Sequence, residues 1–319
     1  MPSLVECVPN FSEGRRPDVV AAIVAQIERA LGQSVLDVHR DVDHHRSVVT
    51  FVGSPEMVER AALAGIAAAV AHLTLQTHAG VHPRIGVADV VPFVPVSGVT
   101  MAECVALAHR VSRRVAGEYG VPVFCYGEAA CQPAYRDLAA IRRAIRTSPT
   151  FPRPDFGPAQ PHPTAGAVAI GARDYLIAFN VELLTDALDV AKAIARDLRA
   201  AQSGLPGVKA LGLRLASRGT VQVSMNLTDT RQTRPVDVFN AVVAAAKRHA
   251  VAVGRPELVG LIPTAEAAVG FDGSHFEGAL AGALFPDEKI LERRLTLISD
   301  EEGVGGKHDI TGKSPAAGG

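Results

Sequence analysis

The sequence predicts an α+β protein made of two ferredoxin-like subdomains, each a split β-α-β unit, lying side by side. One reason is a repeated order of elements: strand, helix, strand, strand, helix, strand occurs before residue 100 and again after residue 174, in unrelated sequence. The other is composition, because 319 residues that are 48% hydrophobic and 20% charged can bury one large core or two medium ones. We expect the helices of each unit to cover one face of its sheet.

The first unit begins at residues 3–10, whose β-branched residues and final Pro-Asn pair indicate a strand that runs into a turn. Residues 17–31 follow with apolar side chains at helical spacing behind a proline suited to a first helical turn. Two β-rich runs, at about 35–39 and 47–53, are the next strands. An alanine-rich helix then starts at Ser54, which has the side chain of an N-cap residue.

Three further elements lengthen the first unit. They are a strand at 89–96, a helix opened by the capping box of Thr100 and Glu103, and a strand at 121–127. The segment 149–163, with six prolines, carries little helical pattern, so we expect it to cross the surface or line a cleft.

The second unit repeats the order with different residues. Its predicted elements are a strand at 174–180, an amphipathic helix at 184–201, two strands within 208–227 around a Ser-Arg-Gly turn, a helix at 235–250 and a strand at 256–263. We therefore expect an N-terminal subdomain at residues 1–178 and a C-terminal subdomain at 179–300. Residues 301–319 have almost no apolar content and are predicted to be a disordered tail.

Charge and composition exclude several classes of protein. The chain has 32 Lys+Arg, 33 Asp+Glu and no basic block longer than an arginine pair, so nucleic acid is not an expected partner. Neither a signal peptide nor an apolar run of the ~18 residues needed to span a bilayer is evident, so we expect no membrane association. The four cysteines, Cys7, Cys104, Cys125 and Cys131, have the spacing of neither a disulfide framework nor a zinc ribbon. They are interpreted as reduced, mostly buried thiols of a cytoplasmic protein.

Reactive side chains are densest at residues 78–89, HAGVHPRIGVAD. Pro83 disfavours helical backbone at His82 and fixes the turn, so the imidazole is presented from a rigid loop. A histidine held in this way can act as a general base near neutral pH. The alternative is a polar turn in which His82 and Arg84 only cap the segment 37–43.

A metal site is a second alternative, because six of the eleven histidines fall between residues 39 and 82: His39, His44, His45, His72, His78 and His82. No H-E-x-x-H motif is present, and a three-ligand zinc pattern cannot be assembled from these spacings. We therefore predict no metal at this site.

Long stretches of the sequence resemble the glutamate formimidoyltransferase family, in a stand-alone form without a cyclodeaminase domain. The resemblance covers about residues 4–263 and is carried by VECVPNFSEG at 5–14, DHHRSVVTFVG at 43–53, HAGVHPRIGVADVVPFVPV at 78–96, PVFCYGEAA at 122–130, GARDYLIAFN at 171–180 and QVSMNL at 222–227. These motifs are long and occur in the order of the family.

The resemblance implies an enzyme (EC 2.1.2.5) that moves a formimino group from N-formimidoyl-L-glutamate to N5 of tetrahydrofolate, in histidine degradation. It implies tetrahydrofolate as co-substrate, no metal, a folate cleft between the two subdomains, and a homodimer. The histidine of the family's H-P-R motif, the catalytic base, falls on His82. The folate-associated segment, which opens with G-A-x-x-x-G-A-R, falls on residues 166–175.

Several other side chains are expected to hold the substrates. Arginines suit the substrate carboxylates, and asparagines at matching strand ends suit the pterin or amidine, unless they only form turns. The expected substrate- and folate-binding residues are Asn10, Asp37, His39, Arg46, Arg84, Gly166, Ala167, Gly171, Arg173 and Asn180.

Two departures from the family pattern leave alternatives open. The segment AIRTSPTFPRPDF at 144–156 replaces a Gly-Glu-aromatic-Glu stretch, and His39 stands where some relatives carry an acid. The alternatives are a formyl rather than a formimino donor, a folate-binding protein without catalysis, and a metal-dependent hydrolase.

Overall fold

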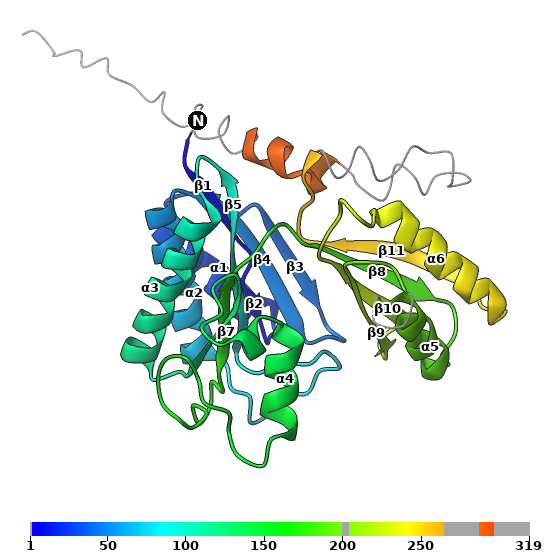
Figure 1. Ribbon diagram of the computed structural model, residues 1–319, viewed down its shortest axis with the longest axis horizontal. Helices are drawn as coiled ribbons and strands as arrows, with labels where there is room; N and C mark the ends of the chain where they lie inside the picture. Colours follow the sequence, from blue (N-terminus) through cyan, green and yellow to red (C-terminus); the bar gives the residue numbers. More distant parts are fainter. Residues whose placement is uncertain (1, 200–203, 265–286, 297–319) are drawn as a thin grey trace, which may run out of the picture.

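The structure is a computed structural model that describes residues 2–199, 204–264 and 287–296 (Figure 1). The chain forms two sheets, one of seven strands and one of four. Helices and strands follow one another in mixed order along the chain, which confirms the α+β class. The predicted tail at 301–319 lies outside the described residues.

The first unit contains, in chain order, β1 (Leu4–Cys7), β2 (Asn10–Phe11), α1 (Pro17–Leu31), β3 (Asp37–Asp41), β4 (Arg46–Gly53), α2 (Pro55–His72), β5 (Ala88–Ser97), α3 (Met101–Tyr119), β6 (Val123–Gly127), η1 (Pro133–Tyr135), α4 (Leu138–Thr147) and β7 (Val168–Ala172). The second contains β8 (Ile177–Leu183), α5 (Leu188–Leu198), β9 (Val208–Leu215), β10 (Thr220–Leu227), α6 (Pro235–Arg248) and β11 (Val253–Val259). A short turn, η3 (Asp287–Lys289), lies further along the chain.

The larger sheet has an antiparallel and a parallel part. β1 pairs antiparallel with both β4 and β5, and β3 forms the edge beyond β4. On the other side β5, β7 and β6 run parallel to one another. Helices α1, α2 and α3 cover one face and bury Phe11, Phe51 and Phe93 against it. On the opposite face, Ile141 of α4 packs against Phe124 of β6.

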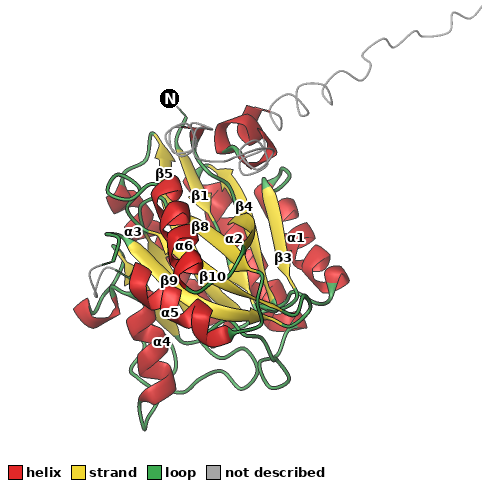
Figure 2. Ribbon diagram, turned by 90° about the vertical axis from the view of Figure 1, so that its right-hand side faces the viewer, coloured by secondary structure: helices red, strands yellow, loops and turns green. Residues whose placement is uncertain are grey.

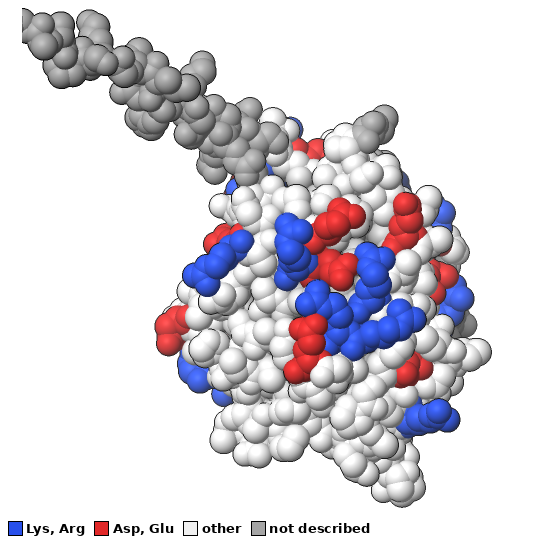
Figure 3. Space-filling view, turned by 90° about the vertical axis from the view of Figure 1, so that its left-hand side faces the viewer, with Lys and Arg blue, Asp and Glu red and all other residues white. Residues whose placement is uncertain are grey.

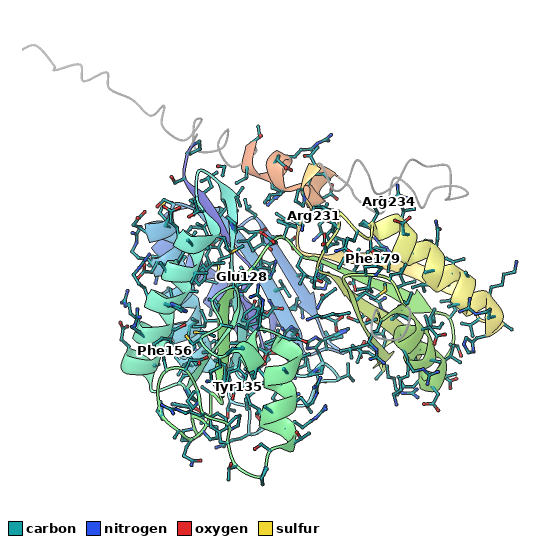
Figure 4. All side chains as sticks on the ribbon, in the orientation of Figure 1. Glu128, Tyr135, Phe156, Phe179, Arg231 and Arg234 are labelled. Carbon is teal, nitrogen blue, oxygen red and sulfur yellow. The ribbon has the colours of Figure 1, made fainter. Side chains whose placement is uncertain are left out.

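The smaller sheet has the order β11-β8-β10-β9, and every neighbouring pair is antiparallel. Helices α5 and α6 cover one face, toward which Phe179 of β8 points with Ile177 and Val181 (Figure 4). Side chains alternate along a strand, so Asn180 and Gln222 lie on the other face. Figure 2 shows α5 and α6 in front of their sheet, with the larger sheet behind it.

Polar contacts join the two units around the space between their sheets. Ser217 Oγ, in the β9–β10 turn, donates to Asp43 Oδ2 at 2.6 Å. Lys209 Nζ of β9 lies 2.6 Å from Oδ1 of Asp137, the N-cap residue of α4. Tyr175 Oη donates to the Leu261 carbonyl at 3.1 Å. His39 of β3 also lies 3.7 Å from Glu257 of β11, so the face of the smaller sheet that α5 and α6 leave uncovered is turned toward the α4 side of the larger sheet.

Local signals in the sequence located most elements. Ser54 accepts from the Met57 N–H as the N-cap of α2, and Thr100 forms the expected capping box with Glu103. The prediction that Asn180 ends a strand is wrong, because β8 continues to Leu183. β11 starts at residue 253 rather than 256, since Pro256 sits inside an edge strand, where a missing N–H is tolerated.

The change from one sheet to the other falls between β7, which ends at Ala172, and β8, which starts at Ile177. The proline-rich segment 149–163 precedes β7 and so lies within the first unit. A subdomain boundary at residue 178 stays a proposal.

The outer surface of α2 and α3 carries charges of both signs in close alternation (Figure 3). Arg110 pairs with Glu59 at 3.0 Å and Arg114 with Glu118 at 2.7 Å. In the described part of the chain, every helix is too short or too polar to cross a bilayer.

Gly86 tests how tightly the chain is packed behind the candidate site. A Cβ at Gly86 would lie 1.7 Å from the Ala167 carbonyl oxygen, which is backbone and cannot turn away. We expect Gly86→Ala to lower the free energy of unfolding by at least about 3 kcal/mol, measured by urea denaturation. Gly117→Ala in α3 is the control: its Cβ meets nothing within 4 Å, and it should raise stability by up to about 1 kcal/mol. A Gly86→Ala protein as stable as wild type would contradict this packing.

Candidate active site

Asp89 of β5 is the buried charge at the centre of the candidate site. Its Oδ2 accepts from Arg46 Nη1 at 2.6 Å and from Arg142 Nη2 at 2.7 Å, and its Oδ1 accepts from the Ile85 N–H at 2.7 Å. Burial alone would raise the pKa of Asp89, but Arg142 and Arg46 outweigh it and hold that pKa well below 3.8. The carboxylate is therefore ionised and joins β4, α4 and the loop before β5.

The loop at residues 78–87 is held by hydrogen bonds along its length. Ser12 Oγ donates to the Gly86 carbonyl at 2.7 Å, and the Val87 N–H donates to the Ala165 carbonyl at 3.0 Å. Arg84 Nη2 donates to the His78 carbonyl at 2.6 Å. Arg84 thus braces the loop from within, a use that the sequence did not indicate.

His82 is positioned by this loop as a neutral imidazole. Its Nδ1 lies 2.8 Å from the Pro83 carbonyl, which can only accept, so Nδ1 carries the proton and Nε2 keeps its lone pair. Burial, followed by the charges of Arg46 and Arg142, holds the pKa of His82 well below 6.5. At neutral pH this imidazole can accept a proton at Nε2.

A second imidazole lies beside His82. The rings of His44 and His82 are 5.9 Å apart between centroids, and His44 is 7% exposed. His44 Nδ1 is 2.8 Å from Asp41 Oδ2. Burial alone would raise the pKa of Asp41, but the hydrogen bonds that Asp41 accepts from His44 lower that pKa to about 2. Within the described residues, His44 Nε2 is buried without a hydrogen-bond partner.

The second unit contributes a polar group to the same space. Glu257 of β11 accepts from Asn180 Nδ2 at 3.1 Å and from Gln222 Nε2 at 3.4 Å. Across the sheets, its Oε1 lies 3.7 Å from His39 Nε2. Two of the predicted residues, His39 and Asn180, are therefore brought together by a glutamate that the sequence reasoning missed.

Several buried polar atoms near the inner faces of the sheets lack a partner among the described residues. They are Arg142 Nε, Gln222 Oε1, Thr50 Oγ1, Asp37 Oδ2 and His44 Nε2. Buried polar groups are normally satisfied, so a group of orphaned donors and acceptors is typical of a place that receives a polar ligand.

The remaining polar candidates lie around this space. Asn10 Oδ1 accepts from Arg46 Nε at 3.0 Å, and Asp37 Oδ1 accepts from Lys289 Nζ at 2.8 Å. Arg173 follows β7, and its charge partly offsets the burial that raises the pKa of Glu6.

The three small residues expected to contact folate have tight backbone surroundings. The Ala167 N–H donates to the Ile85 carbonyl at 2.9 Å. Gly166 has a φ of 73°, and a Cβ there would lie 2.4 Å from the same carbonyl. A Cβ on Gly171, in β7, would lie 2.4 Å from the Tyr126 carbonyl. Close backbone packing by itself accounts for both glycines.

Two cavities adjoin the site without including His82. One, of about 340 Å³, is lined by residues that include Glu13, His45 and His78; the other, of about 270 Å³, includes Asp37 and Lys289. His45 and His78 are stacked with centroids 4.1 Å apart. We therefore place the candidate site by its buried charges and its unpaired polar atoms and not by the volume of a cavity.

Sequence comparison identifies the family. A model of the formiminotransferase domain's N-terminal subdomain matches residues 4–173, and a model of the formiminotransferase domain matches residues 178–272. The chain belongs to the formiminotransferase family.

Curated relatives match most of the chain. Glutamate formimidoyltransferase of Thermoplasma acidophilum is 43% identical over 310 residues, which are 94% of this chain and 100% of that protein. The Streptococcus pyogenes protein of the same name is 37% identical over 82% of this chain and 90% of its own length. Formimidoyltransferase-cyclodeaminase of Sus scrofa is 41% identical over 82% of this chain and 51% of that protein. The predicted resemblance, and the enzyme class that it implied, are confirmed.

Glu6 gives a test of the electrostatics at the junction of the two units. It is buried, with Tyr175 Oη 3.3 Å from its Oε1, and burial raises its pKa from 4.5 to about 7 against the opposing effects of Arg173 and Tyr175. Between pH 4.5 and about 7 the folded protein therefore keeps the Glu6 proton, which the unfolded chain releases. The stability that the protonated Glu6 contributes is complete below pH 4.5 and is lost as the pH rises through 7.

We expect the stability of wild type relative to Glu6→Gln to fall by on the order of 2–3 kcal/mol between pH 4.5 and pH 8, measured by urea denaturation. Glu128→Gln, which changes an exposed carboxylate, is the control and should show no such trend. Parallel pH profiles for wild type and Glu6→Gln would show that Glu6 titrates normally.

Proposed function

We propose that this protein transfers the formimino group of N-formimidoyl-L-glutamate to N5 of tetrahydrofolate, giving 5-formimidoyltetrahydrofolate and L-glutamate. The observation that carries the proposal is His82, a neutral imidazole with its lone pair on Nε2, beside a buried Asp89 with two arginines. The names of the curated relatives support the reaction.

In this reaction N5 of the reduced pterin attacks the amidine carbon of the donor and forms a tetrahedral intermediate. His82 Nε2 accepts the proton that N5 loses, and the imidazolium returns it to the departing glutamate nitrogen as the carbon–nitrogen bond breaks. One imidazole thus serves both steps, and the proton is conserved. A low pKa favours the neutral form that starts the cycle and makes the imidazolium a strong acid for the second step.

We place the substrates between the open faces of the two sheets. Arg142 Nε, a buried donor without a partner among the described residues, and Arg173 suit the donor or folate carboxylates. Gln222 Oε1 and Glu257 suit the donor groups of the pterin ring. The order β11-β8-β10-β9 in the smaller sheet also supports ferredoxin-like subdomains on either side of a folate cleft.

The first test replaces His82. We expect His82→Ala to lower kcat at least ~100-fold, the effect of losing a general base, in an assay that follows the acid-dependent absorbance of the 5,10-methenyl product. His249→Ala, at an exposed position beyond α6, is the control and should retain activity. Activity of His82→Ala within about tenfold of wild type would remove His82 from the chemistry. An inert wild type that still binds tetrahydrofolate would contradict the formimino donor and direct the search to formyl-glutamate.

The second test changes the charge near His82. Arg142→Gln removes a cation that lowers the pKa of His82, so that pKa should rise and the acidic limb of the pH profile of kcat/KM should move to higher pH. The position of the limb is independent of how much enzyme is active. Arg142→Lys keeps the charge, and Arg143→Gln changes an exposed neighbour, so both should leave the limb in place. An unmoved limb in Arg142→Gln would contradict the electrostatic account.

A further inference from the structure

We propose that His109, Cys125 and Cys131 form a site for a soft divalent cation of the Zn²⁺ class, separate from the candidate active site. His109 lies on α3, Cys125 on β6 and Cys131 in the segment that follows. One ligand atom from each, imidazole nitrogen or thiol sulfur, lies within 4.8 Å of the others. Thiolate and imidazole are the ligands that zinc prefers in proteins.

The spacing suits tetrahedral coordination. His109 Nε2 is 3.7 Å from Cys131 Sγ. With Zn–S of about 2.3 Å and Zn–N of about 2.0–2.1 Å, the nitrogen–sulfur edge of a tetrahedron is about 3.6 Å. This edge therefore already has about the length that coordination requires, and Cys125 Sγ lies within 4.8 Å of both atoms.

Neighbouring groups hold the two cysteines in place. Asp155 Oδ2 accepts from the Cys125 N–H at 2.7 Å, and its Oδ1 accepts from Nε2 of Gln132, the residue after Cys131, at 2.8 Å. The carboxylate also adds negative charge beside the site. Phe156, the next residue, stacks under the Arg113 guanidinium and lies by α3 (Figure 4). These contacts are the outer shell that orients metal ligands.

Binding can be written with all protons balanced. In the metal-free protein, His109 Nε2–H donates to the Ala129 carbonyl at 2.8 Å. Two protons leave Cys125 and Cys131 as thiolates form, and the His109 proton moves to Nδ1 so that Nε2 can coordinate. Cys131 is exposed, which leaves the fourth position to water, and that water can donate to the Ala129 carbonyl.

The site lies on the other side of β6 from the reactive groups. Cys125 Sγ lies 3.6 Å from Ser112 Oγ of α3, so Cys125 points toward α3, and its neighbours Phe124 and Tyr126 point to the face that carries α4. The segment after Cys131 leads into α4, which brings Arg142 to Asp89. A bound cation would therefore fix the segment that positions α4, as a structural metal rather than a reactant.

The test is titration of the reduced, full-length protein with Co²⁺ after removal of metals by a chelator. We expect one equivalent to bind with a thiolate-to-cobalt absorbance band and visible bands of tetrahedral cobalt, and Zn²⁺ to displace it. Cys131→Ser, at an exposed position, and His109→Ala should each weaken binding at least ~100-fold. Cys104→Ala, a buried cysteine on the same helix outside the cluster, should bind as wild type does.

Two results would overturn the proposal. One is a reduced protein that binds no Co²⁺, or that binds it equally well as Cys131→Ser. The other is a protein whose reduced form takes up no metal and whose mass falls by two units after exposure to oxygen, because Cys125 and Cys131 form a disulfide. Neither result depends on the transferase assay.

Discussion

The buried carboxylate of Asp89 joins three segments that are far apart in the sequence. Arg46 comes from β4, Arg142 from α4, and the Ile85 N–H from the loop that carries His82. A buried charge costs free energy unless opposite charges and hydrogen bonds satisfy it. Loss of one partner of Asp89 would therefore leave part of a buried charge unsatisfied. The position of α4 and the shape of the His82 loop therefore depend on the same group.

The same charges set the chemistry of His82. Burial first, and then the charges of Arg46 and Arg142, disfavour the imidazolium, and the Pro83 carbonyl selects the Nδ1–H tautomer. Burial and the arginines together outweigh the opposing charge of Asp89, so the ring stays neutral while the arginines keep donors for anionic substrates. A loop held by Arg84 and Ser12 keeps Nε2 in one place. Reactivity and substrate binding in this account come from one electrostatic arrangement.

Local sequence signals were sufficient for most elements, because Ser54, Thr100 and the apolar spacing of α1 act within a single helix. They failed for β7, whose sequence VAIGA has few β-branched residues and is a strand only because β5 and β6 flank it. The H-P-R motif pointed to His82 directly. Asp89 ends the reactive stretch at 78–89, but the sequence alone assigns it no role, since its importance depends on arginines that only the fold brings to it.

Two further residues could not be found from the sequence for related reasons. Arg142 belongs to an ordinary-looking Ile-Arg-Arg stretch, and its orientation comes from the packing of α4 on β6. Glu257 sits on an edge strand of the other unit and meets His39 only through the arrangement of the two sheets. Cys125 and Cys131 were read correctly as thiols, but their approach to His109 required β6 to lie against α3.

The central claim is that burial, together with the two arginines that bind Asp89, holds His82 as a neutral, Nδ1-protonated imidazole. The most direct measurement is a pH titration of the imidazole ¹⁵N chemical shifts of His82, assigned by comparison with His82→Ala. The account predicts a protonated Nδ1 and a lone pair on Nε2 at neutral pH, with a midpoint clearly below 6.5. A midpoint at or above 6.5, or the opposite tautomer, would contradict it.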